Sequence, residues 1–293
     1  MDYLFTSLIF FSLFFSSVKA QEYPLFITDD GYIIVGVTLC DSVEANFMLD
    51  TGAGANVLSQ KTFEKVQQFA VETGCFTGFR HDGDRLDGVT YELPSLAIGN
   101  KVQSNTQVGI YPPLDDYGVE GLVSMKFFED KPFTIDFKQK QLRFPEQEEL
   151  KVLAATGTVL PLSFSTQTDI VLDIFIPVCI NNEVEVTTLF DTGSGYGGMI
   201  LNPYYLPKLL TDSSAVKSRP YTTPLSHQSS EDRLLELASV DVCNDDAPLN
   251  LEMIDVTAVF REGMIHEGLM GSKMFRDRVI TIDIPGKRMI VQD

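Results

Sequence analysis

Tryptophan is missing from this sequence of 293 residues, and histidine and cysteine are rare, with three and four copies. None of the His or Cys residues stands in a metal-ligand spacing such as C-x-x-C or H-E-x-x-H. The phosphate-binding G-x-x-x-x-G-K motif and the G-x-S-x-G turn of serine hydrolases are also absent. The sequence therefore predicts no metal and no cofactor, and it gives no support for a His-dependent nucleophile.

Basic residues are also scarce. Lys and Arg total 22 against 41 Asp and Glu, which gives a net charge of -19. Proteins that bind nucleic acid need basic surfaces to neutralise phosphates, and amphipathic helices on membrane surfaces are usually basic too. We therefore expect no nucleic-acid partner, and we interpret the acidity as an ordinary solvated surface.

Long hydrophobic runs are limited to one, Leu4–Phe15, near the N-terminus. Val18 and Ala20 fit the small-residue rule for signal-peptide cleavage, although the segment before the run has no Lys or Arg. The run is shorter than the roughly 20 apolar residues of a spanning helix. We predict that residues 1–20 are a signal peptide cleaved near Ala20 and that the protein is exported, either secreted or periplasmic. An uncleaved membrane anchor is the alternative interpretation.

Export makes disulfide bonds permissible, and four cysteines allow three pairings. Two cysteines lie in each half of the sequence, so one bridge per half is conceivable. Free buried thiols are the other interpretation. The sequence leaves the pairing of these residues open: Cys40, Cys75, Cys179 and Cys243.

The rest of the sequence has the pattern of β-strands. Runs of β-branched and aromatic residues alternate with Gly, Asn, Asp and Pro. Helical patterns are limited to Thr62–Val71 and Tyr204–Leu210. This distribution predicts a mostly β fold of the sandwich or barrel class. The predicted strands are Tyr32–Thr38, Phe47–Leu49, Tyr91–Ile98, Phe133–Phe137, Ile170–Cys179, Leu234–Val242 and Val279–Ile284.

Three short segments recur in the same order along the chain. Asp50-Thr51-Gly52 returns 141 positions later as Asp191-Thr192-Gly193, and two downstream segments return 147 positions later. Matched landmarks at nearly constant offset indicate an internal duplication. We predict two lobes, residues 23–145 and 157–293, joined by an acidic linker over residues 146–156. The downstream segments are Gly121–Phe128 with Gly268–Phe275, and Thr134–Phe137 with Thr281–Ile284.

With two Asp-Thr-Gly motifs, each followed by an apolar-apolar-Gly segment, the sequence resembles the aspartic protease superfamily of pepsins and retroviral proteases. The second segment, Leu269-Met270-Gly271, matches fully, whereas Leu122-Val123-Ser124 has Ser in place of Gly, and we expect slight crowding there. The resemblance covers almost the whole chain after the signal segment. It implies a bilobal fold of two pseudo-twofold-related, β-barrel-like lobes, with a cleft between them and a hairpin flap above it. The small size of the lobes suggests a retropepsin-like type fused in tandem.

The resemblance assigns catalysis to Asp50 and Asp191. Two close carboxyls cannot both ionise at modest pH, so they share one proton. One member then acts as general base on a water molecule while the other acts as general acid toward the peptide carbonyl. The expected function is an aspartic endopeptidase that cleaves protein or peptide substrates as a monomer, because both half-sites lie in one chain. A catalytically weak or inactive peptide-binding relative is the alternative. The supporting loop residues are Thr51, Gly52, Thr192, Gly193 and Ser194.

The two Asp loops differ in one residue that bears on chemistry. Ser194 can donate a hydrogen bond to its aspartate, but Ala53 cannot. We therefore expect Asp191 to be the charged member of the pair more often than Asp50. Tyr196, in the longer second loop, is expected either near the cleft or in plain packing.

Two polar turns are candidates for the flap: residues 80–85 in the first half and residues 226–231 in the second. Either could cover the cleft, and a charged surface turn is the simpler alternative for both. Asp136 and Asp283 match each other in the repeat, but we expect them to be structural strand ends.

Overall fold

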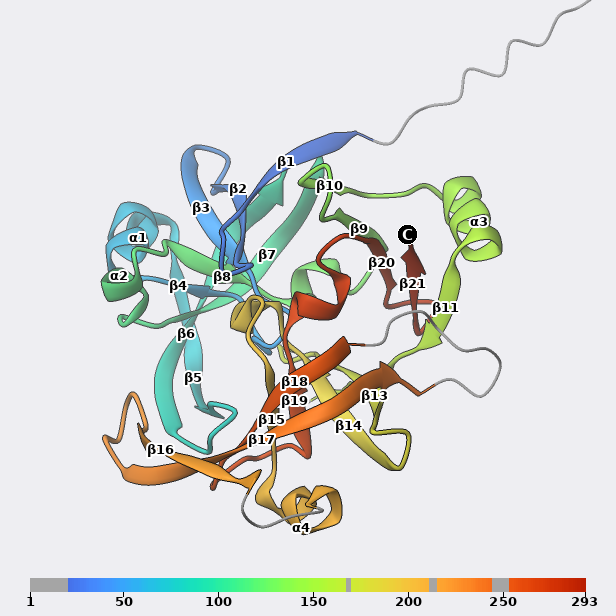
Figure 1. Ribbon diagram of the computed structural model, residues 1–293. Helices are drawn as coiled ribbons and strands as arrows, with labels where there is room; N and C mark the ends of the chain where they lie inside the picture. Colours follow the sequence, from blue (N-terminus) through green and yellow to red (C-terminus); the bar gives the residue numbers. More distant parts are fainter. Residues whose placement is uncertain (1–20, 167–169, 211–214, 244–252) are drawn as a thin grey trace, which may run out of the picture.

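The computed structural model describes residues 21–166, 170–210, 215–243 and 253–293, and the predicted signal peptide lies outside these ranges. The described chain forms two β-rich lobes on one continuous central sheet (Figure 1). Within the described ranges, no helix is long and apolar enough to cross a membrane. The mostly β, two-lobed fold predicted from the sequence is confirmed.

Lobe 1 is a barrel-like sheet that closes where β2 (Ile33–Leu39) pairs with β6 (Arg85–Ile98). Its strands alternate buried and exposed side chains, as expected where one face covers a core. Each strand position predicted in this lobe lies in or beside an observed strand. The strands are β2 (Ile33–Leu39), β3 (Val43–Leu49), β4 (Val57–Leu58), β5 (Val71–Phe79), β6 (Arg85–Ile98), β7 (Lys101–Ile110) and β8 (Gly121–Val123).

Lobe 2 repeats the same set of pairings. Strand β14 pairs in parallel with β19, as β3 does with β8, and β13 pairs with β17, as β2 does with β6. This correspondence relates the two lobes by a pseudo-twofold axis. The strands of lobe 2 are β12 (Ser163–Ser165), β13 (Asp173–Ile180), β14 (Val184–Phe190), β15 (Met199–Leu201), β16 (Lys217–Thr222), β17 (Ser229–Val242), β18 (Met253–Phe260) and β19 (Gly268–Met270).

Six further strands join the lobes in one antiparallel sheet, in the order β11-β21-β20-β9-β10-β1. Thr134 of β9 pairs with its repeat counterpart Thr281 of β20, and their buried hydroxyls are 2.8 Å apart. The pseudo-twofold axis therefore passes between these two residues. The strands are β1 (Glu22–Ile27), β9 (Phe133–Asp136), β10 (Gln141–Arg143), β11 (Thr158–Pro161), β20 (Val279–Asp283) and β21 (Arg288–Gln292).

The helices are short and peripheral. Residues 62–71 were expected to be one helix, but Val71 instead begins β5, because Ala70 turns to extended backbone after a 3-10 turn. The α-helices are α1 (Gln60–Val66), α2 (Leu114–Tyr117), α3 (Gln147–Thr156) and α4 (Leu206–Leu209). The 3-10 turns include η1 (Gln67–Phe69), η2 (Met125–Phe128), η3 (Thr192–Ser194), η4 (Pro203–Tyr205) and η6 (Ser272–Phe275).

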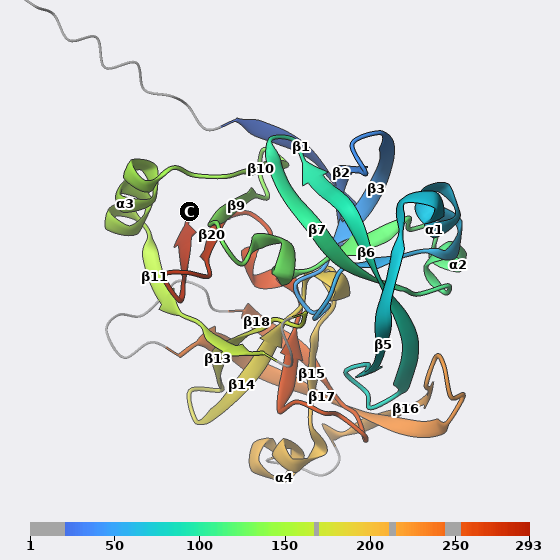
Figure 2. The ribbon, with the colours of Figure 1, turned by 180° about the vertical axis from the view of Figure 1, so that it is seen from behind.

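The predicted linker, residues 146–156, contains α3. Leu150 and Leu153 lie on one helical face and pack against Ile290 of β21. Figure 2 shows α3 beside β11 and β21 at one side of the central sheet. The lobe boundaries themselves stay a prediction.

One disulfide bond joins Cys179 of β13 to Cys243 at the end of β17, with the Cα atoms 5.1 Å apart. The two strands already pair in this region, so the bond crosslinks neighbouring strands of lobe 2. Cys40 is a buried free thiol and Cys75 an exposed one. One bridge in each half was conceivable from the sequence, and the structure has one in the second half, while both cysteines of the first half are free.

Candidate active site

Asp50 and Asp191 follow directly after β3 and β14. The N–H of Asp50 donates to the carbonyl oxygen of Val123 (3.0 Å), and the N–H of Asp191 donates to that of Met270 (2.9 Å). Each Asp loop is thus tied to the apolar strand of its own lobe, β8 or β19. The structure brings the two carboxyls into contact with each other.

Thr51 and Thr192 connect the two loops across the pseudo-twofold axis. The Thr51 hydroxyl donates to the carbonyl oxygen of Phe190 (2.5 Å) and accepts from the N–H of Thr192 (2.9 Å). The Thr192 hydroxyl donates to the carbonyl oxygen of Leu49 (2.7 Å) and accepts from the N–H of Thr51 (3.1 Å). Both threonines are fully buried, so each bond is made without competition from water.

Gly52 and Gly193 let each loop approach the aspartate of the other. A Cβ atom on Gly52 would lie 2.5 Å from Oδ1 of Asp191, and one on Gly193 would lie 2.5 Å from Oδ1 of Asp50. Any side chain at either position would displace a carboxyl group. The glycines of both Asp-Thr-Gly motifs are therefore required by close packing around the carboxyl pair.

The carboxyl of Asp50 holds its proton more strongly than an ordinary aspartate. Burial raises its pKa well above the usual range, and the charge of Asp191 and the hydrogen bond with Asp191 raise it further. The N–H groups of Gly52 (2.9 Å) and Ala53 (3.0 Å) donate to Oδ1 of Asp50 and oppose this shift. The expectation that Asp191 is more often charged stays a prediction.

Ser194 supplies the asymmetry that was expected from the sequence. Its hydroxyl donates to Oδ2 of Asp191 (2.8 Å), which favours the ionised form. At the matching position of the first loop, Ala53 has no hydroxyl to offer Asp50. The two otherwise similar loops therefore differ by one side-chain hydrogen bond to their aspartates.

Replacing Ala53 by Ser is expected to give Asp50 the donor that Asp191 already has. The pKa of Asp50 should then fall, because the ionised form gains a hydrogen bond. Loss of the general acid would occur at lower pH, so the alkaline limb of the pH–rate profile should move toward acid. A pH series of kcat/KM on one peptide, for wild type and Ala53→Ser, measures this. An unchanged or alkaline-shifted limb would contradict the hydroxyl argument.

Ser124, which replaces the Gly of the downstream motif, is accommodated without the crowding expected from the sequence. It is fully buried on extended backbone, and its N–H donates to Oδ1 of Asn56 (2.8 Å). Its hydroxyl lies 3.2 Å from the same oxygen. At Gly271, by contrast, a Cβ atom would lie 2.6 Å from the carbonyl oxygen of Gly195. The Asn56 side chain in one lobe thus replaces close backbone packing in the other.

Tyr196 takes part in packing between the lobes. Its N–H donates to the carbonyl oxygen of Asp30 (2.6 Å), and its ring lies where a Cβ atom of Gly31 would stand. The Arg276 guanidinium is 5.1 Å from the ring centre. Of the two positions expected for Tyr196, the structure shows the one in packing.

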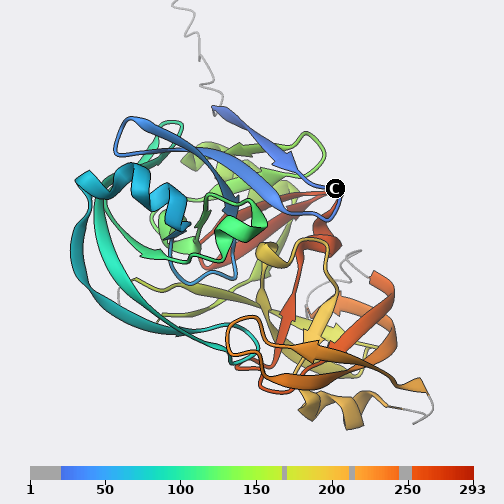
Figure 3. The same ribbon diagram turned by 90° about the vertical axis from the view of Figure 1, so that its left-hand side faces the viewer.

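Above the Asp loops, both predicted turns meet each other. The β5–β6 hairpin reaches from lobe 1 to the β16–β17 hairpin of lobe 2 (Figure 3). The Asp84 carboxylate accepts hydrogen bonds from the N–H groups of Leu225 (2.6 Å) and Ser226 (3.0 Å), and Tyr221 donates its hydroxyl to Asp82. The second turn spans residues 223–228, because residues 229–231, assigned to the turn from sequence, belong to β17. We call these contacts the hairpin latch.

A buried charged group supports the hairpin latch from lobe 2. Arg261 makes two hydrogen bonds with the fully buried Asp232 (2.9 and 2.8 Å), and its guanidinium stacks on the ring of Tyr221, 3.4 Å from the centre. His81, at the hairpin tip of lobe 1, lies 3.2 Å from the same guanidinium. Burial lowers the pKa of His81, and Asp191 is among the charges that act on it. The tip of the β5–β6 hairpin therefore lies near the carboxyl pair.

Replacing Asp84 by Ala is expected to loosen the hairpin latch. Burial acts to raise the pKa of Asp84, but hydrogen bonds from Ser226 and Leu225 outweigh it and lower the pKa. Hydrogen bonds to charged groups contribute roughly 1.5–3 kcal/mol each, so amide hydrogen exchange at residues 80–84 and 223–226 should accelerate by at least about tenfold. Because the pKa is lowered, the stabilisation is present above the unfolded pKa and is lost as pH falls through the folded one.

The matched control for the hairpin latch is Asp87→Ala. Asp87 lies on the same hairpin but pairs within it, with Arg85 and Thr77. Exchange at the two tips should stay near the wild-type rate in this variant. Equal acceleration in both variants would show that the β5–β6 hairpin is loosened generally and that Asp84 has no particular role across the lobes.

Other residues singled out in the sequence have structural positions. Asp136 accepts from the N–H of Gln139 (2.8 Å), and Asp283 accepts from that of Gly286 (2.9 Å), as expected for strand ends. Among the described residues, no group of three or more His, Cys, Asp or Glu side chains could hold a metal ion.

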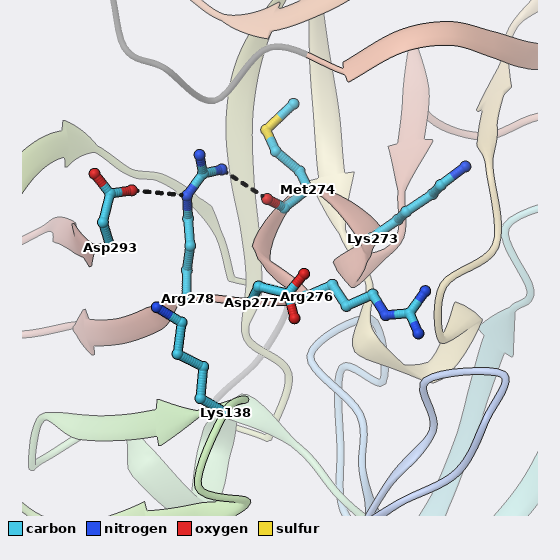
Figure 4. A pocket seen from close by; sticks show the side chains of 7 residues that line it. All are labelled: Lys138, Lys273, Met274, Arg276, Asp277, Arg278 and Asp293. Carbon is cyan, nitrogen blue, oxygen red and sulfur yellow. Dashed lines mark hydrogen bonds and ion pairs between the residues drawn. The ribbon is translucent and has the colours of Figure 1, made fainter.

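An open pocket of about 290 Å³ lies away from the Asp loops (Figure 4). Arg278 is held there by Asp293 and by the carbonyl oxygen of Met274. None of its lining residues belongs to the Asp loops or the hairpin latch. They are Lys138, Lys273, Met274, Arg276, Asp277, Arg278 and Asp293.

Several residues of the site were not identified from the sequence. Tyr221 of the hairpin latch and its supports Arg261 and Asp232 are marked by no motif, and the role of Asp84 across the lobes was not foreseen. The available signal was the polar turn at residues 80–85, whose two aspartates are more buried than a surface turn predicts. Their partners lie about 140 residues further along the chain.

Comparison with known proteins supports the interpretation of this geometry. A family profile described as aspartyl protease matches residues 35–127, which include the first Asp loop and the strand that supports it. No curated protein matches the sequence. Among solved structures, Basic 7S globulin from soybean is similar, with a TM-score of 0.52 at 9% identity, over 93% of this chain and 94% of that one. At this identity the similarity concerns the fold alone.

The first Asp loop lies inside the matched segment, and the second is its structural counterpart across the pseudo-twofold axis. The fold of both lobes is the one that the resemblance implied. On these grounds, residues 35–127 are similar to the aspartyl protease family, and the chain as a whole shares the fold of Basic 7S globulin.

Proposed function

We propose that this protein is an aspartic endopeptidase whose catalytic unit is the Asp50–Asp191 pair. The observation that carries the proposal is the contact between the two carboxyls, with the pKa of Asp50 raised well above its usual range. A pair in this state holds one proton and one negative charge at moderately acidic pH. These are the general acid and the general base that hydrolysis of a peptide bond needs.

In the proposed mechanism, the ionised Asp191 accepts a proton from a water molecule placed between the carboxyls. The water oxygen attacks the peptide carbonyl carbon while protonated Asp50 donates to the carbonyl oxygen. The tetrahedral intermediate then collapses as Asp191 gives its proton to the departing amine nitrogen and one hydroxyl of the intermediate returns a proton to Asp50. Ser194 donates a hydrogen bond to Asp191, and the threonine bonds keep both carboxyls in place.

The two hairpins determine when a substrate can reach the pair. The hairpin latch joins them above the Asp loops, so a polypeptide would enter after these contacts open. The substrate is expected to be an extended or unfolded segment, because both hairpins must close around it. A single chain supplies both half-sites, so we propose that the monomer is active. We further propose that the reaction needs no metal and no cofactor, and that the protein acts after export.

Cleavage of casein at pH 3 to 6, with and without pepstatin, tests the proposed function. The proposal requires fragments that disappear when pepstatin is added. The alternative, a relative that binds peptides without cleaving them, requires pepstatin binding by calorimetry but no fragments. Fragments that persist with pepstatin would point to another hydrolase class or a contaminant and would contradict the proposal.

A further inference from the structure

Asp173 is a third carboxyl group close to the Asp loops, and the proposed mechanism does not use it. It is the first residue of β13, and its side chain is partly buried. Among the described residues, its carboxyl takes part in no hydrogen bond or ion pair. Carboxylates in such positions are normally paired, because removing a charge from water without a partner costs free energy.

The β13–β14 ladder ends two residues short of Asp173 and Asp191. Its last pair is Phe175 with Leu189, and Asp173 itself pairs with Ser165 of β12. Continuing the register by two residues makes Asp173 and Asp191 corresponding positions, which the alternation of side chains puts on one face. In lobe 1 the same register, from Ile34 and Met48, makes Tyr32 correspond to Asp50. The position that is aromatic in lobe 1 is therefore acidic in lobe 2.

The first Asp loop also touches Asp173. Oδ1 of Asp173 lies 3.3 Å from the position that a Cβ atom of Gly54 would take. The N–H of Leu172 donates to the carbonyl oxygen of Gly54 (3.0 Å). Asp173 thus lies beside Gly54 of the first Asp loop, four residues from Asp50. We take this loop as one wall of the place where a peptide would lie over the carboxyl pair.

The surroundings of Asp173 suit a long basic side chain. Phe175, two residues along the same face of β13, is partly buried and packs against an apolar cluster. Lys and Arg lay their aliphatic stems on such surfaces and extend the charged group to a carboxylate. The cluster consists of Leu189, Met264 and Leu269.

We propose that Asp173 is a specificity-determining residue, which pairs with the Lys or Arg side chain of a substrate residue next to the scissile bond. The inference rests on the proposed function, because it takes Asp50 and Asp191 as the place where the substrate lies. Asp173 has no cationic partner within the described chain, and the substrate side chain supplies one.

Burial raises the pKa of Asp173 to about 6. The carboxyl is therefore neutral in acid and charged above this pH, so its attraction for a cation should appear as pH rises through about 6. The titratable groups near it include those of the carboxyl pair, Asp50 and Asp191, and His266, whose ring packs edge-on against Phe175 with the ring centres 5.3 Å apart. Burial lowers the pKa of His266. Both peptides of a matched pair meet the same carboxyl pair, so its own titration cancels in the ratio of their kcat/KM values. Asp173→Asn retains His266, so any change in Lys preference that comes from His266 remains in that variant.

Peptides that differ only by Lys or norleucine test the inference. The residue is moved through the three positions on each side of the scissile bond, and kcat/KM is measured from pH 4 to 7. At one position wild type should prefer Lys by about 10- to 100-fold at the higher pH and less in acid. Asp173→Asn should lose both the preference and its pH dependence. Asp30→Asn, in the matching turn of lobe 1, should keep both.

Two further measurements separate the possible failures. Binding of statine-containing Lys and norleucine peptides is measured by calorimetry, so that recognition is tested without turnover. Thermal unfolding should show a higher Tm for Asp173→Asn than for wild type at pH 7.5 and equal values in acid, since an unpaired charge is removed.

Peptide cleavage with no Lys preference at any position overturns the inference and leaves the proposed function intact. A Lys preference in binding without cleavage supports the inference and overturns the proposed function, and absence of binding by both peptides contradicts both.

Discussion

Replacing either Asp50 or Asp191 by Asn is expected to lower kcat/KM on a peptide substrate by about 10³-fold or more. Either substitution removes the shared proton arrangement, so the pair loses its acid or its base. The double variant should be no slower than the singles, because groups that act as a unit are not additive. Steady-state kinetics of the three variants at one acidic pH, with folding checked by circular dichroism, make the measurement.

Asp136→Asn serves as the matched control for the carboxyl pair. This residue ends strand β9 of the central sheet, and its carboxylate holds the N–H of Gln139 in a turn, which an Asn oxygen can also do. Its activity should stay near that of wild type. Turnover within about tenfold of wild type in Asp50→Asn or Asp191→Asn would show that the pair is not the catalytic unit.

Replacing Thr51 by Val is expected to destabilise the protein by about 2–4 kcal/mol and to slow catalysis. The substitution keeps the shape but leaves the carbonyl oxygen of Phe190 and the N–H of Thr192 without their buried partner. Each unsatisfied buried group costs roughly 1–3 kcal/mol. The carboxyl pair would also lose alignment, for which a fall in kcat of about 10- to 100-fold is expected. Thr192→Val should have the same effect, because its bonds mirror those of Thr51.

Thr188→Val provides the control for this pair of threonines. Its hydroxyl is also fully buried and donates to the carbonyl oxygen of Ile176 (2.9 Å), but both groups belong to lobe 2. Denaturant unfolding should show a smaller loss of about 1 kcal/mol, with kcat unchanged. If the Thr51 and Thr188 variants lose stability and activity equally, the bonds across the axis have no special role.

Much of the lobe architecture could be predicted from the sequence because it is locally encoded. Strand positions follow from alternating apolar residues and turn residues, as β13 shows with its regular alternation of buried and partly buried side chains. The repeated Asp-Thr-Gly motifs indicated where the carboxyl pair would form. The hydrogen bond from Ser194 to Asp191 could also be expected from the sequence, because a hydroxyl three residues from a carboxylate acts locally.

The segments that sequence patterns assigned wrongly or not at all depend on distant partners. Residues 147–156 carry an acidic, weakly amphipathic pattern, and they form α3 where Leu150 and Leu153 meet Ile290. The bond between Cys179 and Cys243 could not be chosen from three pairings until β13 and β17 were seen to be neighbours. Short local patterns do not encode contacts between residues that are far apart in the sequence.

The sequence by itself determined the class of fold, the repeat and the two aspartates, because these rest on residue types at short spacing. Only the tertiary structure decided that the two polar turns meet, that Asp84 caps a hairpin of the other lobe, and that Asp173 lies beside Gly54 with no partner among the described residues. A carboxylate on a flexible chain is simply hydrated. Its pKa, its partners and its chemical use follow from which distant groups exclude water from it and which supply hydrogen bonds.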